Sequence, residues 1–321
     1  MGAYIVRRLI WAVFVVLIVT LITYFIFFIM PPGDPTLRFA GKSPTPETLA
    51  AVRERFGLDG AWYQQFATFV KRVFTGDEWG WPGLGFSYDT RVSVRDELID
   101  RMPRTLFLAF GAAIVWAVMG VTIGVISAIK RGSLLDRAAM GFALFGVSAP
   151  VFWLGLVALW VFWEKLGILP GTGYVPFSEN PKDWFLHMIL PCLVLALLYA
   201  AFYARITRGN LLETMGEDYI RTARAKGLSE RKVIMKHGLR ASLTPVVTMF
   251  GMDIALLIGG AVIIETVFNW QGAGSWVIRA TFTGNLPVVV AVVLMGAIAV
   301  VILNLIVDIV YAYLDPRVRY Q

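Results

Sequence analysis

Residues 41–43 have the types that end a phosphate-binding loop, in which backbone amides and a lysine hold nucleotide phosphates. The full pattern requires a glycine at position 36, where this chain has Thr36, and no strand–loop–helix pattern surrounds the segment. We therefore expect this chain to hold no ATP and no magnesium.

The sequence also lacks the residue patterns of metal sites and of hydrolytic enzymes. The chain has only two histidines, His187 and His237, and the orientation derived below places them on opposite sides of a membrane. They form neither a metal cluster nor a zinc-protease motif, and no G-x-S-x-G elbow is found. We expect no metal, no catalytic residue and no enzyme.

Three carboxylates do lie within long apolar runs: Asp253, Glu265 and Asp308, the last near Asn304. Ionisable groups inside a membrane are costly and by default mark function. Glu265 is near the end of its run and is expected to reach the interface. With no lysine or arginine partner in these runs, the residues predict either the lining of a polar translocation path or hydrogen bonds between helices.

A polar, basic block separates two of the apolar runs. Glu217 and Asp218 begin a helical pattern that Arg221, Arg224 and Lys226 close, an order that suits the helix dipole. Glu217 and Arg221 have the spacing of a side-chain pair. Gly227 can end this helix in the left-handed conformation, and Ser229 can cap a second one carrying Arg231, Lys232 and Lys236. The block predicts a docking platform or a solvated connector.

The composition indicates the setting of these residues. The 321 residues are 58% hydrophobic and 16% charged, whereas a soluble domain has roughly 25% charged residues. The net charge of +7 does not indicate a nucleic-acid partner, because the basic residues follow the loops between apolar runs. The single cysteine, Cys192, excludes a disulfide within the chain.

Six apolar runs are long enough to cross a bilayer, which requires about 20 residues each. We therefore expect an all-α integral membrane protein whose first helix is retained. Pro150 and Pro191 fall inside the third and fourth runs, where neighbouring helices can tolerate them. The runs are Leu9–Met30, Thr105–Ile129, Ala138–Trp163, Trp184–Ile206, Leu243–Val267 and Leu286–Leu314.

The distribution of lysine and arginine predicts the orientation. Both ends of the chain and the 205–242 loop are basic, whereas the short loops on the other side hold only Lys165, Lys182 and Arg279. Both termini are therefore expected in the cytoplasm. The expected segments are an N-terminus with the first helix (1–30), an extracytoplasmic insertion (31–104), a five-helix core (105–314) and a cytoplasmic tail (315–321).

The insertion and the helix contacts also carry predictions. Helices are expected over Pro46–Phe56, Trp62–Phe74 and Arg91–Arg104, with the aromatics of the second forming the core of a small cap. A loop is expected over Asp77–Tyr88, and a re-entrant or interfacial piece over Asn269–Asn285. Small residues permit two helices to approach closely, either within the chain or between subunits. Gly120 and Gly124 form one such set, for which packing within the chain is favoured. Gly251, Ala255, Gly259 and Gly260 form a second set.

Several segments together resemble the permease subunit of oligopeptide and dipeptide ABC importers of the binding-protein-dependent class, nearly from end to end. They are RRLIWAVFVVLIVT near the start, PGDP at 32–35, LPG at 169–171, EDYIRTARAKGLS at 217–229, HGLR at 237–240, IIETVFNWQGAGSW at 263–276 and the terminal LDPRVRY. The block at 217–240 is similar to the family's EAA loop. His237 and Arg240 depart from the wider consensus in the manner of the peptide-transport branch.

The resemblance implies a type I importer permease whose basic block docks on an ATPase. It implies as partners a second, homologous permease, two ABC ATPases that bind ATP and magnesium, an extracytoplasmic binding protein and membrane lipid, in the inner membrane. The coupling residues it implies are Glu217, Asp218, Arg221, Ala223, Gly227, Leu228, His237, Leu239 and Arg240. The alternatives are an importer of a nickel chelate or oligosaccharide, a secondary transporter and, more remotely, an intramembrane enzyme.

Overall fold

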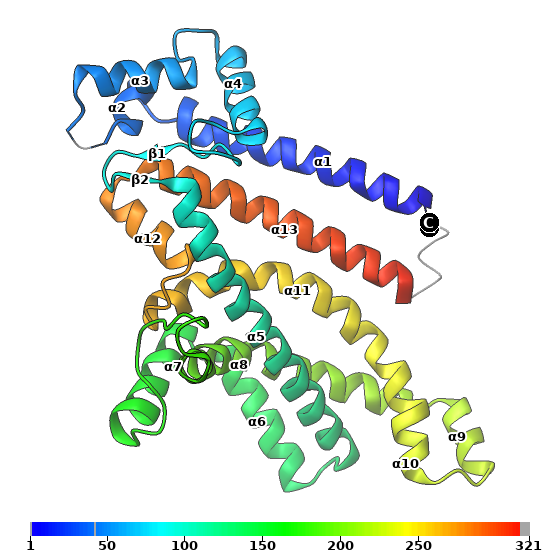
Figure 1. Ribbon diagram of the computed structural model, residues 1–321. Coiled ribbons are helices and arrows are strands. Elements are labelled where there is room, and N and C mark those ends of the chain that lie inside the picture. Colours follow the sequence, from blue (N-terminus) through cyan, green and yellow to red (C-terminus); the bar gives the residue numbers. More distant parts are fainter. Residues whose placement is uncertain (1, 42, 315–321) are drawn as a thin grey trace. The chain divides into compact units, whose positions relative to one another are not determined.

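The computed structural model describes residues 2–41 and 43–314, which are mostly helical (Figure 1). The chain divides into two compact units. One unit comprises Met1–Thr105 and Gln271–Gln321, and the other comprises Leu106–Trp270. These units differ from the expected segments, in which the last helix belonged to the core at 105–314, because the last helix packs with the first. Lys42 of the phosphate-loop-like segment and the predicted tail at 315–321 lie outside the described residues.

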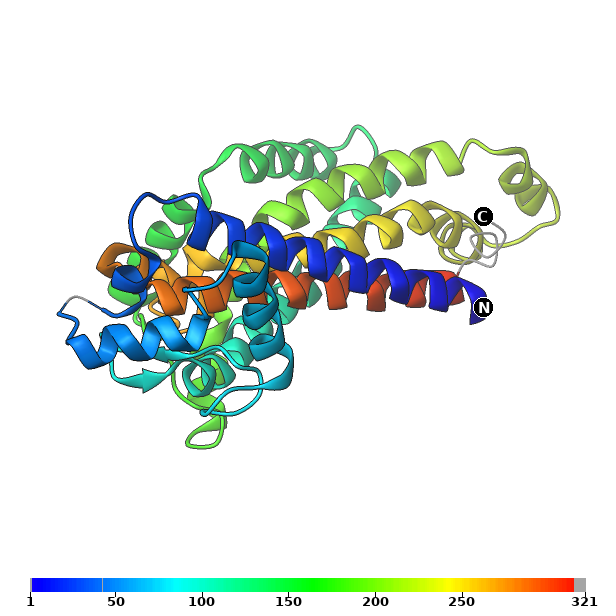
Figure 2. The same ribbon diagram turned by 90° about the horizontal axis from the view of Figure 1, so that it is seen from above.

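The first unit contains the two ends of the chain. α1 (Gly2–Tyr24) continues through a π-helical turn, η1 (Phe25–Ile29), and packs along α13 (Leu286–Leu314), as both views show (Figures 1 and 2). α12 (Ala273–Thr283) also packs on α13 and forms most of the segment 269–285, whose re-entrant or interfacial location stays a prediction. A backbone hydrogen bond from Ala273 N to Thr105 Oγ1, at 2.9 Å, fixes the start of α12.

The insertion folds into a small helical cap in the same unit. It contains α2 (Pro35–Phe39), α3 (Pro46–Phe56), α4 (Trp62–Thr75) and a two-stranded antiparallel ribbon of β1 (Phe86–Ser87) and β2 (Val92–Ser93). Asp34 and Thr45 cap α2 and α3, each followed by a proline, as helix starts prefer. The predicted α3 is confirmed to the residue, and α4 runs one residue further than predicted.

Aromatic side chains form the core of this cap. Phe69 of α4 is buried against Tyr24 and Phe28 of the first helix, with ring centroids 5.7 and 5.5 Å away. The core also includes Val290 and Leu294 of α13. The prediction that the α4 aromatics build a cap core is therefore confirmed for this face, whereas Trp62 and Tyr63 are exposed.

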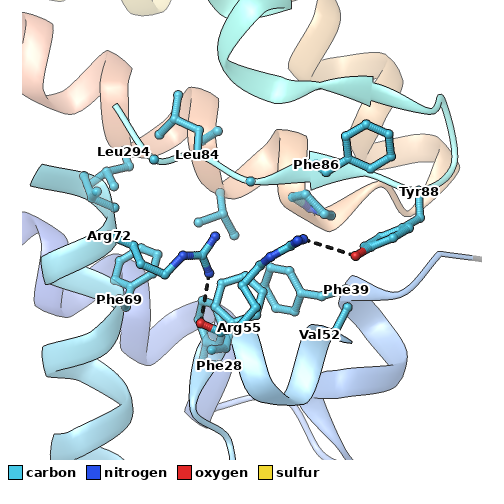
Figure 3. Close-up of a pocket in the computed structure, with 17 residues that line it drawn as sticks. Phe28, Phe39, Val52, Arg55, Phe69, Arg72, Leu84, Phe86, Tyr88 and Leu294 are labelled. Atoms are coloured by element: carbon cyan, nitrogen blue, oxygen red, sulfur yellow. Dashed lines mark hydrogen bonds between the residues drawn. The ribbon is translucent and has the colours of Figure 1, made fainter. Parts of the chain in front are cut away.

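Two arginines border this aromatic core (Figure 3). Arg55 Nη1 donates to the Tyr88 hydroxyl at 3.1 Å, and Arg72 Nη1 donates to the Arg55 carbonyl at 3.2 Å. Arg72 also donates to Asp77 at 3.3 Å and lies over the Phe56 ring. Burial, then the charge of Arg55, lowers the pKa of Arg72. Ionic contacts on one side and ring contacts on the other thus join α3, α4 and the following loop.

The second unit is built from the long helices. α5 (Val94–Ile129) enters it at Leu106 and is followed by α6 (Leu134–Ser148), α7 (Val151–Ala158), the π-helical η2 (Leu159–Lys165) and α8 (Pro181–Thr214). α11 (Leu239–Val267) packs on α7 and α8. Pro191 is tolerated inside α8, as predicted.

The small residues of α5 meet α8 within the chain. A Cβ added to Gly120 would stand 2.6 Å from Cβ of Tyr203, and one added to Gly124 would stand 2.6 Å from the Ala204 carbonyl oxygen. Packing within the chain is thus confirmed for this pair. In α11, Gly251 is buried, whereas the side chains of residues 255, 259 and 260 lie outside the described residues.

The third predicted span is broken in the middle. Instead of one helix over Ala138–Trp163, α6 and α7 meet at a bend of 110°. Ala149 is extended, with φ −77° and ψ 132°, because a residue before proline is pushed out of the helical region. Pro150 is the N-cap of α7. A proline inside a continuous helix, as predicted for both positions, is therefore found at Pro191 but not at Pro150.

Over residues 2–41 and 43–314, four helices are long and apolar enough to cross a membrane, or five if the bent pair counts as one span. They are Ile5–Ile29, Val94–Ile129, Pro181–Thr214 and Leu286–Ile309. The fifth predicted span, Leu243–Val267, lies within the single helix α11, in which the side chains of several residues are not described.

Candidate functional site

The basic block forms a helix, a glycine turn and a second helical arm, which we call the foot (residues 217–240). α9 (Asp218–Ala225) ends at Gly227, whose φ of +76° is left-handed. Gly227 N donates to the Arg224 carbonyl and Leu228 N to the Ala223 carbonyl, which is the hydrogen-bond pattern of a glycine-terminated helix. The predicted role of Gly227 as a helix end is confirmed.

An ion pair spans the glycine turn. Arg224 donates through Nε and Nη2 to the two carboxylate oxygens of Glu230, at 3.1 and 2.8 Å. These hydrogen bonds lower the pKa of Glu230 and raise that of Arg224. Both side chains are exposed, so the pair spans the turn but adds little to stability.

The two arms also share a small apolar interior. Ile220 and Ala223 of α9 are buried with Val233 of the second arm. Gly238 is buried as well, and a Cβ there would lie 2.8 Å from Met215 Sδ. The foot is therefore a packed unit. Ala223, predicted as a coupling residue, belongs to its interior and positions the exposed residues.

The second arm differs from the prediction. Ser229 is the N-cap of α10 (Glu230–Lys232), but its side chain makes no capping hydrogen bond. α10 continues through the π-helical η3 (Val233–Gly238) directly into α11, so no separate second helix exists. The predicted pair of Glu217 and Arg221 is also wrong. Glu217 is extended at the N-cap, and Arg221 pairs instead with Asp218 at 3.3 Å.

The predicted coupling residues thus fall into three places. Glu217, at the N-cap of α9, and Asp218 and Arg221, on α9, are exposed, and Gly227 and Leu228 are exposed at the turn. His237 and Leu239 are half-buried and Arg240 is exposed on the second arm. Two further large side chains of the foot, those of Tyr219 and Met235, are exposed beside charged neighbours.

A partly buried ion pair between the start of α6 and the end of α8 was also not predicted. Arg208 of α8 donates through Nε and Nη2 to the two carboxylate oxygens of Asp136, at 2.7 and 2.8 Å. Asp136 also accepts from Ser127 Oγ and, at 2.8 Å, from the Gly132 amide. The helix that leads into the foot is thereby tied to α6 and to the α5–α6 turn. The sequence shows one acidic and one basic residue, but nothing in it indicates that two residues 72 positions apart form a pair.

Among the predicted polar residues of the membrane helices, Asp253 is the best defined. The buried Tyr203 hydroxyl of α8 donates to Asp253 Oδ2 of α11 at 2.7 Å. Trp116 of α5 is buried beside them and stacks on Tyr199, with ring centroids 4.6 Å apart. Asp253 itself is half-buried. The hydrogen bond between helices is thus observed, and a pathway role for the exposed part of Asp253 stays a prediction.

The remaining polar residues have different surroundings. Glu265 is fully buried, so the expectation that it reaches the interface is wrong; Phe268 and Trp270, which follow it, are buried as well. Asp308 forms an ion pair with Arg8 at 2.8 Å, a basic partner that precedes the first apolar run and was not predicted. Asn304 is exposed one turn away on the same helix.

Comparison with known proteins defines the class. Residues 120–320 match the family described as binding-protein-dependent transport system inner membrane component, and residues 1–109 match the N-terminal part of such components. The chain belongs to this family. It is a multi-pass membrane protein of an inner-membrane transport system, a permease component of an ABC transporter rather than a catalytic subunit.

Individual relatives match over their whole length. The chain is 39% identical over 321 residues to a putative peptide transport system permease protein of Brucella abortus (strain 2308), covering 100% of both chains. It is 37% identical to the dipeptide transport system permease protein DppB of Escherichia coli (strain K12), covering 99% of each. The solved MetNI methionine ABC transporter, at 20% identity, shares the fold with a TM-score of 0.55 over 69% of this chain and 97% of that one.

Proposed function

We propose that the chain is the permease subunit of an ATP-driven importer that moves di- or oligopeptides delivered by an extracytoplasmic binding protein. Family membership and the names of full-length relatives, which are peptide and dipeptide permeases, support this substrate class. The basic loops support an orientation with both termini and the foot in the cytoplasm.

The foot is the observation that carries the coupling mechanism. It is a packed projection with exposed charged residues on α9 and an exposed leucine, Leu228, at its tip. Such a projection fits a cleft in an ATPase subunit, which would bind the ATP and magnesium. Closure of two ATPases would displace this foot and that of a second, homologous permease.

The foot is connected to the membrane helices at both of its ends, so a displacement of the foot would be transmitted to them. The second arm continues into α11 without a break. The first arm follows α8, which Arg208 ties to Asp136 of α6. A movement of the foot would therefore reach α6, α8 and α11 together.

Transport by the purified assembly tests this proposal. The chain would be co-expressed with the neighbouring permease, ATPases and binding protein, and the complex reconstituted in vesicles. Uptake of a labelled dipeptide is expected only with ATP on the foot side and binding protein on the other. Uptake of a nickel chelate or an oligosaccharide instead would change the substrate class, and uptake driven by an ion gradient without ATP would indicate a secondary transporter.

A further inference from the structure

A charged groove lies between α1 and α13 in the first unit. Its volume is about 170 Å³. The Arg8–Asp308 ion pair lies in its wall, with 43% and 31% of the two side chains exposed. The wall residues are Arg8, Trp11, Ala12, Val15, Val301, Asn304, Leu305 and Asp308.

The position of the pair along the helices indicates its depth in a bilayer. Asp308 follows Leu286, the first residue of α13, by 22 residues, and Arg8 precedes Ile29, the last residue of η1, by 21. At ~1.5 Å per residue each distance is ~32 Å, about the thickness of the hydrocarbon core. Trp11, 57% exposed one turn from Arg8, is typical of the same boundary.

In a bilayer, a partly exposed ion pair at this boundary would face lipid headgroups. Exposure of either charge to hydrocarbon would be costly, so polar groups are expected to cover it. The guanidinium of Arg8 has the geometry to donate hydrogen bonds to a phosphate. The Asp308 carboxylate can accept about four hydrogen bonds, and the ion pair with Arg8 involves Oδ2. Asp308 can therefore also accept hydrogen bonds from an ammonium group.

We propose that this groove is a binding site for phosphatidylethanolamine, with its phosphate on Arg8 and Asn304 and its ammonium on Asp308. The zwitterionic headgroup complements a wall that carries one charge of each sign. Phosphatidylcholine lacks the N–H donors that Asp308 would accept, and phosphatidylglycerol has no ammonium group. This inference does not depend on the transported substrate.

Native mass spectrometry of the purified complex with lipids of identical acyl chains tests the site. The wild type is expected to retain phosphatidylethanolamine at least about tenfold more than phosphatidylcholine, as for the loss of one hydrogen bond to a charged group. Asp308→Asn should abolish this preference, and Arg8→Gln should reduce retention of both lipids. Arg7→Gln, a change at the exposed neighbouring arginine, should leave the preference unchanged.

Three results would overturn the proposal. The first is equal retention of the two lipids by the wild type, which can be measured even if a variant fails to fold. The second is an unchanged preference in Asp308→Asn. The third is a preference for phosphatidylglycerol over both, which would assign the groove to anionic lipid.

Discussion

Arg208 and Asp136 are joined by two parallel hydrogen bonds of 2.7 and 2.8 Å, which tie α8 to the first turn of α6. The carboxylate is almost fully buried and also accepts from the Gly132 amide. This geometry requires the planar guanidinium, because a lysine cannot donate in the same two-pronged manner.

We therefore expect Arg208→Lys to weaken the connection between the foot and α6. ATPase binding should persist, because the foot itself is unchanged, whereas peptide uptake per ATP hydrolysed should fall several-fold. Arg205→Lys, at an exposed position on the same helix, is the matched control and should transport normally. Normal uptake by Arg208→Lys would show that this pair has no part in coupling.

The Arg224–Glu230 pair predicts a pH dependence of the foot. The pKa of Glu230 is lowered from its ordinary value of 4.5, so the pair's contribution is present above that value and is lost as the pH falls through the lowered pKa. Hydrogen exchange at Gly227 and Leu228, corrected for intrinsic rates, should increase in that acidic range. Glu230→Gln should show the higher exchange at neutral pH already. Identical profiles for the two proteins would contradict the role of the pair.

In the cap, Asp77 organises the loop between α4 and β1. It accepts from the amides of Trp79 and Gly85 at 3.0 and 2.9 Å, as well as from Arg72. Asp77→Ala would leave Arg72 buried without this carboxylate, at a cost of ~3 kcal/mol. The insertion should become sensitive to protease at a lower temperature.

The control for this variant is Asp59→Asn. Asp59 pairs with Arg53 at 3.7 Å, but its side chain is 81% exposed, so its removal should have little effect. Equal protease sensitivity of the two variants would argue against an organising role of Asp77.

Tyr203 and Asp253 allow the two interpretations of the membrane carboxylate to be separated. Tyr203→Phe removes a hydrogen bond between helices, which is worth about 0.6 kcal/mol in a membrane. A small decrease in thermal stability with normal uptake is expected if packing is its role. Tyr199→Phe keeps the stacking on Trp116 and serves as the control. A large loss of uptake at unchanged stability would instead place Asp253 in the transport path.

Local patterns account for the parts of the fold that the sequence predicts well. Gly227 ends α9, and a proline after a capping residue begins α3, because both depend on neighbouring residues alone. The stretch from Ser229 to Leu243 was harder to predict, since one continuous helical arm and two separate helices have similar sequence patterns.

The failures concern effects that local patterns do not contain. The bend at Pro150 depends on whether neighbouring helices support the freed backbone, which they do at Pro191. The pairs of Arg8 with Asp308 and of Arg208 with Asp136 join residues far apart in the chain, and only the fold brings them together. For the same reason, the burial of Glu265 could not be inferred from its place in an apolar run.

The central claim is that the foot, set by the left-handed Gly227, docks on an ATPase. A Cβ at this position would meet no atom within 4 Å, so a substitution acts through the backbone rather than through a clash. A left-handed valine costs about 1–2 kcal/mol or more, whereas asparagine adopts this conformation at a lower cost, because its short polar side chain can hydrogen-bond locally. We therefore expect Gly227→Asn to keep the left-handed turn and Gly227→Val to change its angle.

The most direct measurement is the amount of ATPase that co-purifies with the tagged chain in mild detergent, quantified by mass spectrometry. The wild type and Gly227→Asn should recover the second permease and the ATPases alike. Gly227→Val should recover the second permease normally but roughly tenfold less ATPase, as expected from the cost of the left-handed conformation, and transport should be uncoupled from hydrolysis. Equal recovery of ATPase by all three proteins, or recovery of no ATPase by any of them, would contradict the proposed docking role of the foot.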